Sequence, residues 1–275
     1  MAILFKRASA LYLSLAISGA VAIYVAVEES FPQSLFAFIT IPLGLMWIYA
    51  SGLIANKYAV KLERKNIALL NDECNPKDYI AFYRKALSKK ALSKPRMFNL
   101  RNYILLNLSV GYLASGDFEY CKQVLDMVSR FPDTKNGALY TACFFNNLAS
   151  YYIRIKELEY AENTLKNMKE VMNSPNFDKK FYEIYDELYY TANIAIQVAR
   201  GNYEGAEDHF NMCFDKETML LRKVAVKCAL GDLYVRLGEH EKAASAFEYV
   251  LQNGKETYYA QKASEYLGKP LIVTP

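Results

Sequence analysis

The first 56 residues hold two long apolar stretches that predict membrane-spanning helices. Residues 8–27 and residues 35–55 carry no charged side chain. At a rise of about 1.5 Å per residue each stretch spans roughly 30 Å, the thickness of the hydrocarbon core of a bilayer. The connection between them, residues 28–34, is short and mostly polar. The pattern predicts a transmembrane helical hairpin over residues 1–56.

Charges at the ends of these stretches predict the orientation of the hairpin. The only charged residues in the connection are the acidic Glu28 and Glu29. Basic residues flank the hairpin on both sides: Lys6 and Arg7 before it, and Lys57, Lys61, Arg64 and Lys65 after it. Because positive charge beside membrane helices stays in the cytosol, we expect both termini and all residues after the hairpin to be cytoplasmic.

The first stretch has an alternative interpretation as a cleaved signal peptide, which also begins with basic residues before an apolar run. The second stretch would then stop transfer, and the downstream chain would still be cytosolic. Neither stretch contains Asp, Glu, Lys, Arg or His. We therefore expect no proton relay or ion pathway, since either would need such a residue facing an internal cavity.

From residue 102 onward the pattern changes to amphipathic helices separated by tight turns. Four turns are predicted, at residues 115–118, 156–158, 201–203 and 238–240, with longer loops near residues 131–137 and 173–180. Small residues recur at fixed places relative to the turns, where they let two helices approach closely: Ser109, Cys121, Ala149, Ala161, Ala206, Gly231 and Ala243. The pattern predicts an all-α domain over residues 102–275, made of stacked helical hairpins.

The fourth hairpin resembles a tetratricopeptide repeat, with LGDLY at residues 230–234, LGEHEKA at 237–243 and then Phe247. The other three hairpins have the same residue pattern, with some departures from it. The turns are 40, 45 and 37 residues apart, against about 34 in the family. The second turn lacks glycine, and the third hairpin has Asn193 and Gln197 where Leu and an aromatic residue are usual. The resemblance implies an α-solenoid of about four irregular hairpins with a C-terminal capping helix over residues 257–267.

The resemblance also implies a binding groove, because the first helix of each repeat lines a concave face in this family. It places there Tyr103, Leu106, Val110, Asn146, Asn147, Ser150, Ile153, Arg154, Leu188, Thr191, Asp232 and Arg236. Family members that clamp acidic C-terminal tails need basic residues where this chain has Leu106, Leu188 and Ala192. We therefore expect an apolar or amphipathic helical ligand, with Asn147, Arg154 and Arg236 at its polar edge. The alternative occupants are the helix over residues 79–92 of the same chain and a second copy of the chain.

Charge is distributed unevenly between the predicted hairpin and the repeats. Residues 57–101, a basic juxtamembrane segment with a predicted helix over 78–92, hold twelve Lys or Arg against four Asp or Glu, whereas residues 102–275 hold 19 against 23. Such a segment attracts anionic lipid head groups. The alternative is that its first basic residues only fix topology and the others form a solvated helix face. We expect no nucleic-acid partner, because no recognition motif accompanies the charge.

The sequence lacks the residue patterns that carry common chemistry. The five Cys include no Cys-x-x-Cys pair, the two His are His209 and His240, and no phosphate-binding glycine motif occurs. We therefore predict no catalytic, cofactor-binding or metal-binding residues, and no enzyme. The resulting hypothesis is a membrane-tethered scaffold or adaptor that binds a protein or peptide partner at the cytosolic face of the membrane. The alternative is a structural or assembly subunit of a larger membrane complex, held by its hairpin. The sequence leaves the partner and the oligomeric state open.

Overall fold

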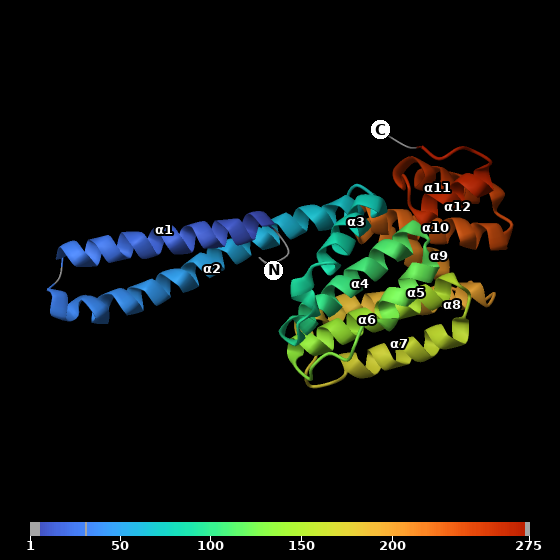
Figure 1. Ribbon diagram of the computed structural model, residues 1–275. Helices are drawn as coiled ribbons and strands as arrows, with labels where there is room; N and C mark the ends of the chain where they lie inside the picture. Colours follow the sequence, from blue (N-terminus) through green and yellow to red (C-terminus); the bar gives the residue numbers. More distant parts are fainter. Residues whose placement is uncertain (1–5, 31, 273–275) are drawn as a thin grey trace. The chain divides into compact units, whose positions relative to one another are not determined.

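The structure, a computed structural model, describes residues 6–30 and 32–272. These residues form twelve α-helices and a few short 3₁₀-helices, with no β-strand among them (Figure 1). The predicted all-α class is confirmed. The chain divides into two compact units, one up to residue 67 and one from residue 68 onward, and each is described by itself.

The first unit is a hairpin of α1 (Lys6–Ser30) and α2 (Gln33–Asn71). Both helices are long and apolar enough to cross a membrane. The connection is shorter than predicted, because residues 28–30 extend α1 and α2 begins at Gln33. The second helix also continues past the apolar stretch to Asn71, through residues that lack Pro and Gly and favour helix. The division between the two units falls within this helix.

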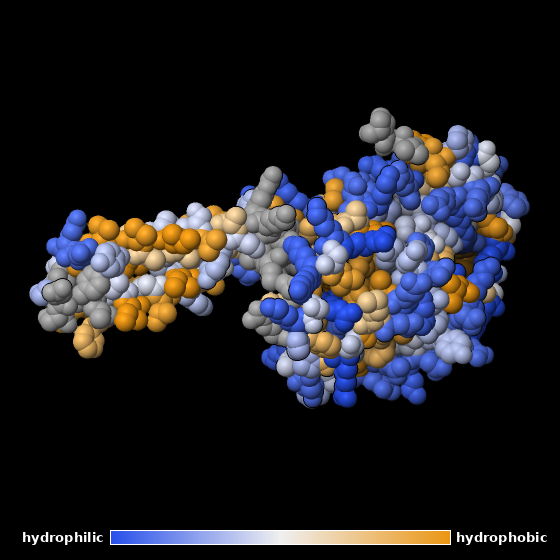
Figure 2. All heavy atoms as spheres, in the orientation of Figure 1, coloured by the Kyte–Doolittle hydropathy of each residue, from blue (hydrophilic) through white to orange (hydrophobic). Residues whose placement is uncertain are grey.

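The two hairpin helices meet through small residues and leave their large apolar side chains outside. Ala8, Ser51 and Ala55 are fully buried. The indole Nε1 of Trp47 donates to the carbonyl oxygen of Leu15 at 2.7 Å, and its ring occupies the space where a Cβ on Gly19 would stand. Only 6% and 11% of the apolar windows of α1 and α2 are buried. Figure 2 shows these exposed apolar side chains along the hairpin.

The second unit consists of consecutive helices that pack on their neighbours in the chain. Its helices are α3 (Pro76–Leu87), α4 (Phe98–Ser115), α5 (Phe118–Asp126), α6 (Lys135–Arg154), α7 (Leu158–Met172), α8 (Tyr182–Ala199), α9 (Ala206–Lys216), α10 (Leu220–Leu237), α11 (His240–Asn253) and α12 (Tyr258–Leu267). The pairs α4–α5, α6–α7 and α10–α11 are hairpins with close contact, and α3 packs on α4. The loops near residues 131 and 175 lie where the sequence predicts them.

The four predicted turns are all present and share one backbone geometry. In each, one residue has the left-handed conformation: Gly116, Lys156, Gly201 and Gly238, with φ of 81°, 64°, 91° and 75°. The next amide N–H returns to a carbonyl five residues earlier, from Asp117 to Tyr112, Glu157 to Tyr152, Asn202 to Gln197 and Glu239 to Tyr234. This bond satisfies an otherwise free carbonyl at the end of a helix. The turn without glycine therefore has the same shape as the others, with Lys156 in a conformation that disfavours a Cβ.

Replacing Lys156 by glycine is expected to raise the free energy of unfolding by about 1 kcal/mol, because glycine adopts the left-handed conformation without strain. The matched control is Gly238→Lys in the fourth turn, where no atom lies within 4 Å of an added Cβ. That change should lower the same free energy by a similar amount. Thermal unfolding of the full chain in detergent, followed by circular dichroism, measures both. A destabilising Lys156→Gly would show that the backbone strain is not significant.

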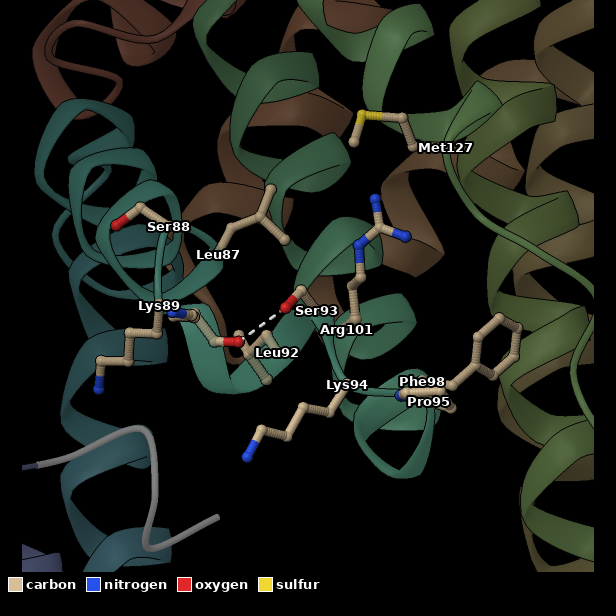
Figure 3. Close-up of a pocket in the computed structure, with 11 residues that line it drawn as sticks. Leu87, Ser88, Lys89, Leu92, Ser93, Lys94, Pro95, Phe98, Arg101 and Met127 are labelled. Atoms are coloured by element: carbon tan, nitrogen blue, oxygen red, sulfur yellow. Dashed lines mark hydrogen bonds between the residues drawn. The ribbon is translucent and has the colours of Figure 1, made fainter.

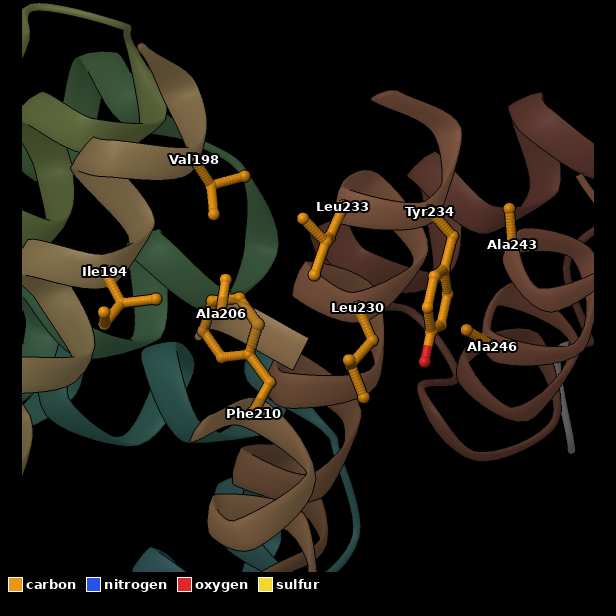
Figure 4. Close-up of a cluster of buried hydrophobic side chains, with 9 residues drawn as sticks. All are labelled: Ile194, Val198, Ala206, Phe210, Leu230, Leu233, Tyr234, Ala243 and Ala246. Carbon is orange, nitrogen blue, oxygen red and sulfur yellow. The ribbon is translucent and has the colours of Figure 1, made fainter. Parts of the chain in front are cut away.

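The small residues predicted at the helix seams lie in the core. Ala161, Ala206 and Ala243 are at most 1% exposed. A Cβ on Gly231 would stand 2.7–2.9 Å from three ring atoms of Phe247, so α10 and α11 approach too closely for any larger residue there. Figure 4 shows the adjoining cluster, in which Ile194, Val198 and Phe210 from α8 and α9 face Leu230 and Leu233 from α10. A second cluster joins α6, α7 and α8 around Leu165 and Met168.

Candidate functional site

The twelve predicted groove residues lie on four helices, α4, α6, α8 and α10. α6 contacts both α4 and α8, so the ten residues that lie on α4, α6 and α8 come from directly packed helices. Two of the twelve are buried inside the unit: Leu106 and Asn147 are 2% and 4% exposed. The Asn147 amide donates to the Leu106 carbonyl oxygen at 3.3 Å and to Ser109 Oγ at 3.0 Å. Asn147 thus links α6 to α4, and its donors are used within the chain.

The C-terminal helix α12 engages two other predicted groove residues. Arg154 on α6 donates to the Tyr259 hydroxyl at 2.8 Å, and its guanidinium lies 4.7 Å from the centre of the Tyr259 ring. Lys262 Nζ forms an ion pair with Asp232 on α10 at 2.5 Å. Because Arg, Lys and Asp lose hydration where helices meet, such mutual pairing offsets part of the cost.

The same helix extends the contact to the first hairpin. α12 touches α4 as well as α10 and α11. The Tyr258 ring packs edge-on against Phe118 with 5.2 Å between ring centres, and it lies over Gly116. The sequence predicts α12 only as a cap on the last hairpin, whereas in the structure it also joins the first and second hairpins to the fourth.

The other predicted occupant, the helix over residues 79–92, has a different place. In the structure this helix is α3, which ends at Leu87. It begins at Pro76, because the Asn75 side chain caps its start. Tyr79 donates its hydroxyl proton to Asn107 Oδ1 at 2.8 Å, and Tyr79 and Ile80 cover Gly111. α3 therefore packs along α4 through Asn107 and Gly111, while Arg154 and Asp232 are engaged by α12.

Part of the predicted face remains accessible. Five half-exposed residues from three packed helices define what we call the open strip: Tyr103, Val110, Asn146, Ser150 and Leu188. None of them carries a charge, and Tyr103 packs edge-on against Tyr140 with 5.9 Å between ring centres. Ile153 and Thr191 are also half-exposed; Ile153 packs on the core, as Leu188 does with part of its side chain, and Thr191 Oγ1 is 2.9 Å from His209 Nε2. Arg236 is exposed on α10.

A cysteine and a histidine four residues apart on α9 come together where α9 packs on α8. Cys213 Sγ lies 3.5 Å from His209 Nε2 and 4.0 Å from Glu187 Oε1. Burial raises the pKa of the Cys213 thiol and lowers the pKa of the His209 imidazole. Both groups are therefore neutral near pH 7, unlike the thiolate of a nucleophilic cysteine. Within the described part of the chain no three His, Cys, Asp or Glu side chains group as metal ligands.

No protein-family model matches this chain, and no curated protein or solved structure matches it either. The resemblance to the tetratricopeptide repeat therefore depends on this chain's own residues. Those residues are the small ones at the helix seams and the four turns of common geometry. The function proposed below depends on the exposed hairpin and on the open strip.

Proposed function

We propose that this protein is a membrane-tethered helical scaffold with tetratricopeptide-like hairpins, which binds an apolar or amphipathic helical segment of a protein partner. The hairpin of α1 and α2 is the tether. The unit that begins at residue 68 lies in the cytosol, with both termini, and presents the binding surface.

The exposure of apolar side chains on the hairpin supports the tether and is the observation that carries the proposal. A helix in the core of a soluble protein buries its apolar side chains, whereas Leu13, Ile17, Phe38, Leu45 and Met46 are between 57% and 79% exposed. Two adjacent helices covered with such residues need an apolar surrounding, which a bilayer supplies. The small residues and the Trp47 contact between the helices are typical of helix pairs in membranes.

The open strip supports the nature of the ligand. It is uncharged and crosses three helices, and a partner helix could bury its apolar side against it. Asn147 and Arg154 are the residues expected at the polar edge of the ligand. In the structure Asn147 donates a hydrogen bond to Ser109, and Arg154 donates one to Tyr259. We therefore restrict the proposed ligand contact to the open strip, and leave Arg236, which is exposed on α10, outside it.

The contacts of α12 favour the second candidate, an assembly subunit of a larger membrane complex held by its hairpin. Because α12 closes part of the predicted face from within, less surface is left for a peptide ligand than an open array would offer. Replacing the hairpin by an unrelated two-helix anchor separates the two functions. A scaffold would keep its function with the new anchor, and a subunit held by its hairpin would lose it.

The partner-binding prediction is tested with a double substitution in the open strip, Tyr103→Asp with Ser150→Glu, in the full chain. Two carboxylates facing an apolar ligand would be desolvated without a partner, so we expect the amount of co-purifying protein to fall roughly tenfold or more. Purification in mild detergent followed by quantitative mass spectrometry measures this loss.

The matched control is Tyr160→Asp with Asn163→Glu on α7, which adds the same charge at exposed positions outside the open strip. It should retain every partner. Circular dichroism shows whether each variant is folded. Retention of all partners by the folded open-strip variant would show that the partner binds elsewhere.

A further inference from the structure

A hollow in the second unit lies outside the proposed binding face and is lined by the basic segment. Its volume is about 540 Å³, within the usual range of small-molecule sites. The wall begins with Leu87 at the end of α3 and ends with Phe98 and Arg101 at the start of α4, and Met127 after α5 closes it (Figure 3). Between them it is lined by Ser88, Lys89, Lys90, Leu92, Ser93, Lys94 and Pro95. All of these elements belong to one unit.

The charge of the hollow is entirely positive among its described lining residues. Lys89, Lys90, Lys94 and Arg101 line it, and none of the described lining residues is acidic. No ion pair between described residues involves Lys90, Lys94 or Arg101. Figure 3 shows the Arg101 side chain between Leu87 and Met127, whereas the Lys94 side chain extends away from Arg101. Cations that line one hollow make its potential positive, and a positive potential favours the binding of an anion.

The backbone adds to this positive potential. α4 begins at Phe98 in the wall of the hollow, and its first turn contains no acidic residue and receives no side-chain cap. The Phe98 N–H donates to the Pro95 carbonyl oxygen of the preceding 3₁₀ turn, so the N–H groups that follow it in the first turn are the ones that lack a side-chain acceptor. These remaining amide donors and the helix dipole both favour a negatively charged group at this end, and a phosphate fits this chemistry well.

The apolar part of the wall indicates what else the ligand carries. Leu87, Leu92, Phe98 and Met127 line the same hollow, and Met127 is 43% exposed although it is a large apolar residue. Leu92 is already buried, and inorganic phosphate would leave Leu87, Phe98 and Met127 partly in water. A phosphate attached to a glycerol backbone and acyl chains would cover these three side chains, and an anionic phospholipid has this composition.

We propose that this hollow binds the phosphate of an anionic phospholipid, held by Lys90, Lys94, Arg101 and the amide end of α4. The inference rests on the proposed tether, which keeps the unit beside a lipid surface. The α3 helix that leads into the hollow is the first helix after the membrane hairpin in the chain. The site would add a lipid-specific contact to an anchor that itself accepts any bilayer.

The test uses the full chain in an uncharged detergent, titrated with dioctanoyl phosphatidic acid and followed by native mass spectrometry. We expect one molecule of phosphatidic acid to bind, with at least tenfold higher affinity than dioctanoyl phosphatidylcholine. The choline cation balances the phosphate charge, so the head group of phosphatidylcholine is neutral overall. Replacing Lys90, Lys94 and Arg101 together by glutamine should weaken binding of phosphatidic acid roughly a hundredfold, through the loss of three charges near the ligand.

Matched controls separate the site from general charge. Replacing Lys135, Lys166 and Lys216 by glutamine removes the same charge at exposed positions outside the hollow, and it should leave the affinity within about twofold. Equal losses in the two triple variants, or equal wild-type affinities for the two lipids, would overturn the proposed site. The comparison of the two lipids uses the wild-type chain alone. It therefore tests the proposed site even if a variant fails to fold.

Two further ligands identify the source of the phosphate. Glycerol 3-phosphate and inorganic phosphate carry the charge without the acyl chains, so we expect both to bind at least tenfold more weakly than phosphatidic acid. Equal affinity for either would overturn the lipid assignment and identify a soluble phosphate as the ligand. Because binding is measured in detergent, the result is independent of membrane insertion, which is tested separately below.

Discussion

Replacing Gly231 by valine is expected to lower the free energy of unfolding of the second unit by about 3 kcal/mol. The expectation follows from the contact between α10 and α11, where an added Cβ would already stand 2.7–2.9 Å from three atoms of the Phe247 ring. The ring cannot give way easily, because Phe247 is 1% exposed and also packs on Tyr266, with 4.7 Å between ring centres. Valine must therefore separate the two helices or force Phe247 out of its position.

A double-mutant cycle tests this cause. The free energy of unfolding of the full chain in detergent is measured for Gly231→Val, Phe247→Leu and both together, by urea denaturation followed by circular dichroism. Leucine removes the ring atoms that clash, so Gly231→Val should cost at least 1 kcal/mol less in the Phe247→Leu background. An equal cost in both backgrounds would show that another neighbour, and not the Phe247 ring, excludes a side chain at this position.

The double substitution Ile17→Arg with Leu45→Arg is expected to remove the chain from the membrane fraction. Ile17 is 57% exposed and Leu45 is 63% exposed, on the two hairpin helices. An arginine near the centre of a membrane helix costs about 2.5–3.5 kcal/mol in insertion experiments, and both helices must insert together. The expected result is a fall of the carbonate-resistant, membrane-bound fraction from most of the protein to a small part of it.

The matched control is Ile184→Arg with Tyr190→Arg on α8, where the side chains are 51% and 55% exposed but lie in the second unit. Charges there should meet water, so the membrane-bound fraction should not change. Extraction of the wild-type chain by carbonate, or full retention of the hairpin variant, would contradict the proposed tether. Equal loss in both variants would point to misfolding, which circular dichroism of the detergent-purified chains would detect.

The hairpin and the repeated turns illustrate how local sequence patterns determine local structure. A charge-free stretch of about twenty residues predicts a long apolar helix. The cost of exposing each apolar side chain to water is a property of that residue and does not depend on the rest of the fold. The length of α2 beyond residue 55 does not follow from that pattern, since Lys57 to Asn71 are polar or mixed residues that form helix well in either setting. Likewise, glycine marks three of the four turns, while Lys156 shows that packing of the two helices can impose the same φ on another residue.

The basic hollow is determined only in part by the local sequence. The sequence shows that residues 57–101 carry a net positive charge, but it does not show which of these residues meet. The predicted helix over residues 78–92 ends at Leu87, and short 3₁₀-helices follow at Lys90–Ser93 and Pro95–Met97. This break folds Lys90 and Lys94 back toward the start of α4, where Arg101 lies in the same wall. A continuous helix would not have enclosed a hollow.

By itself, the sequence determined which faces of the helices are apolar, where the turns lie and which small residues occupy the helix seams. These features depend on the helical period and on contacts between neighbours in the chain. Only the tertiary structure decided what covers the predicted binding face. The contact between Arg154 and Tyr259 joins residues that are 105 positions apart, and the return of α12 to α4 and α6 depends on the summed angles of all the hairpins between them. Periodicity shows that a face is apolar, but its occupant depends on where a distant helix packs.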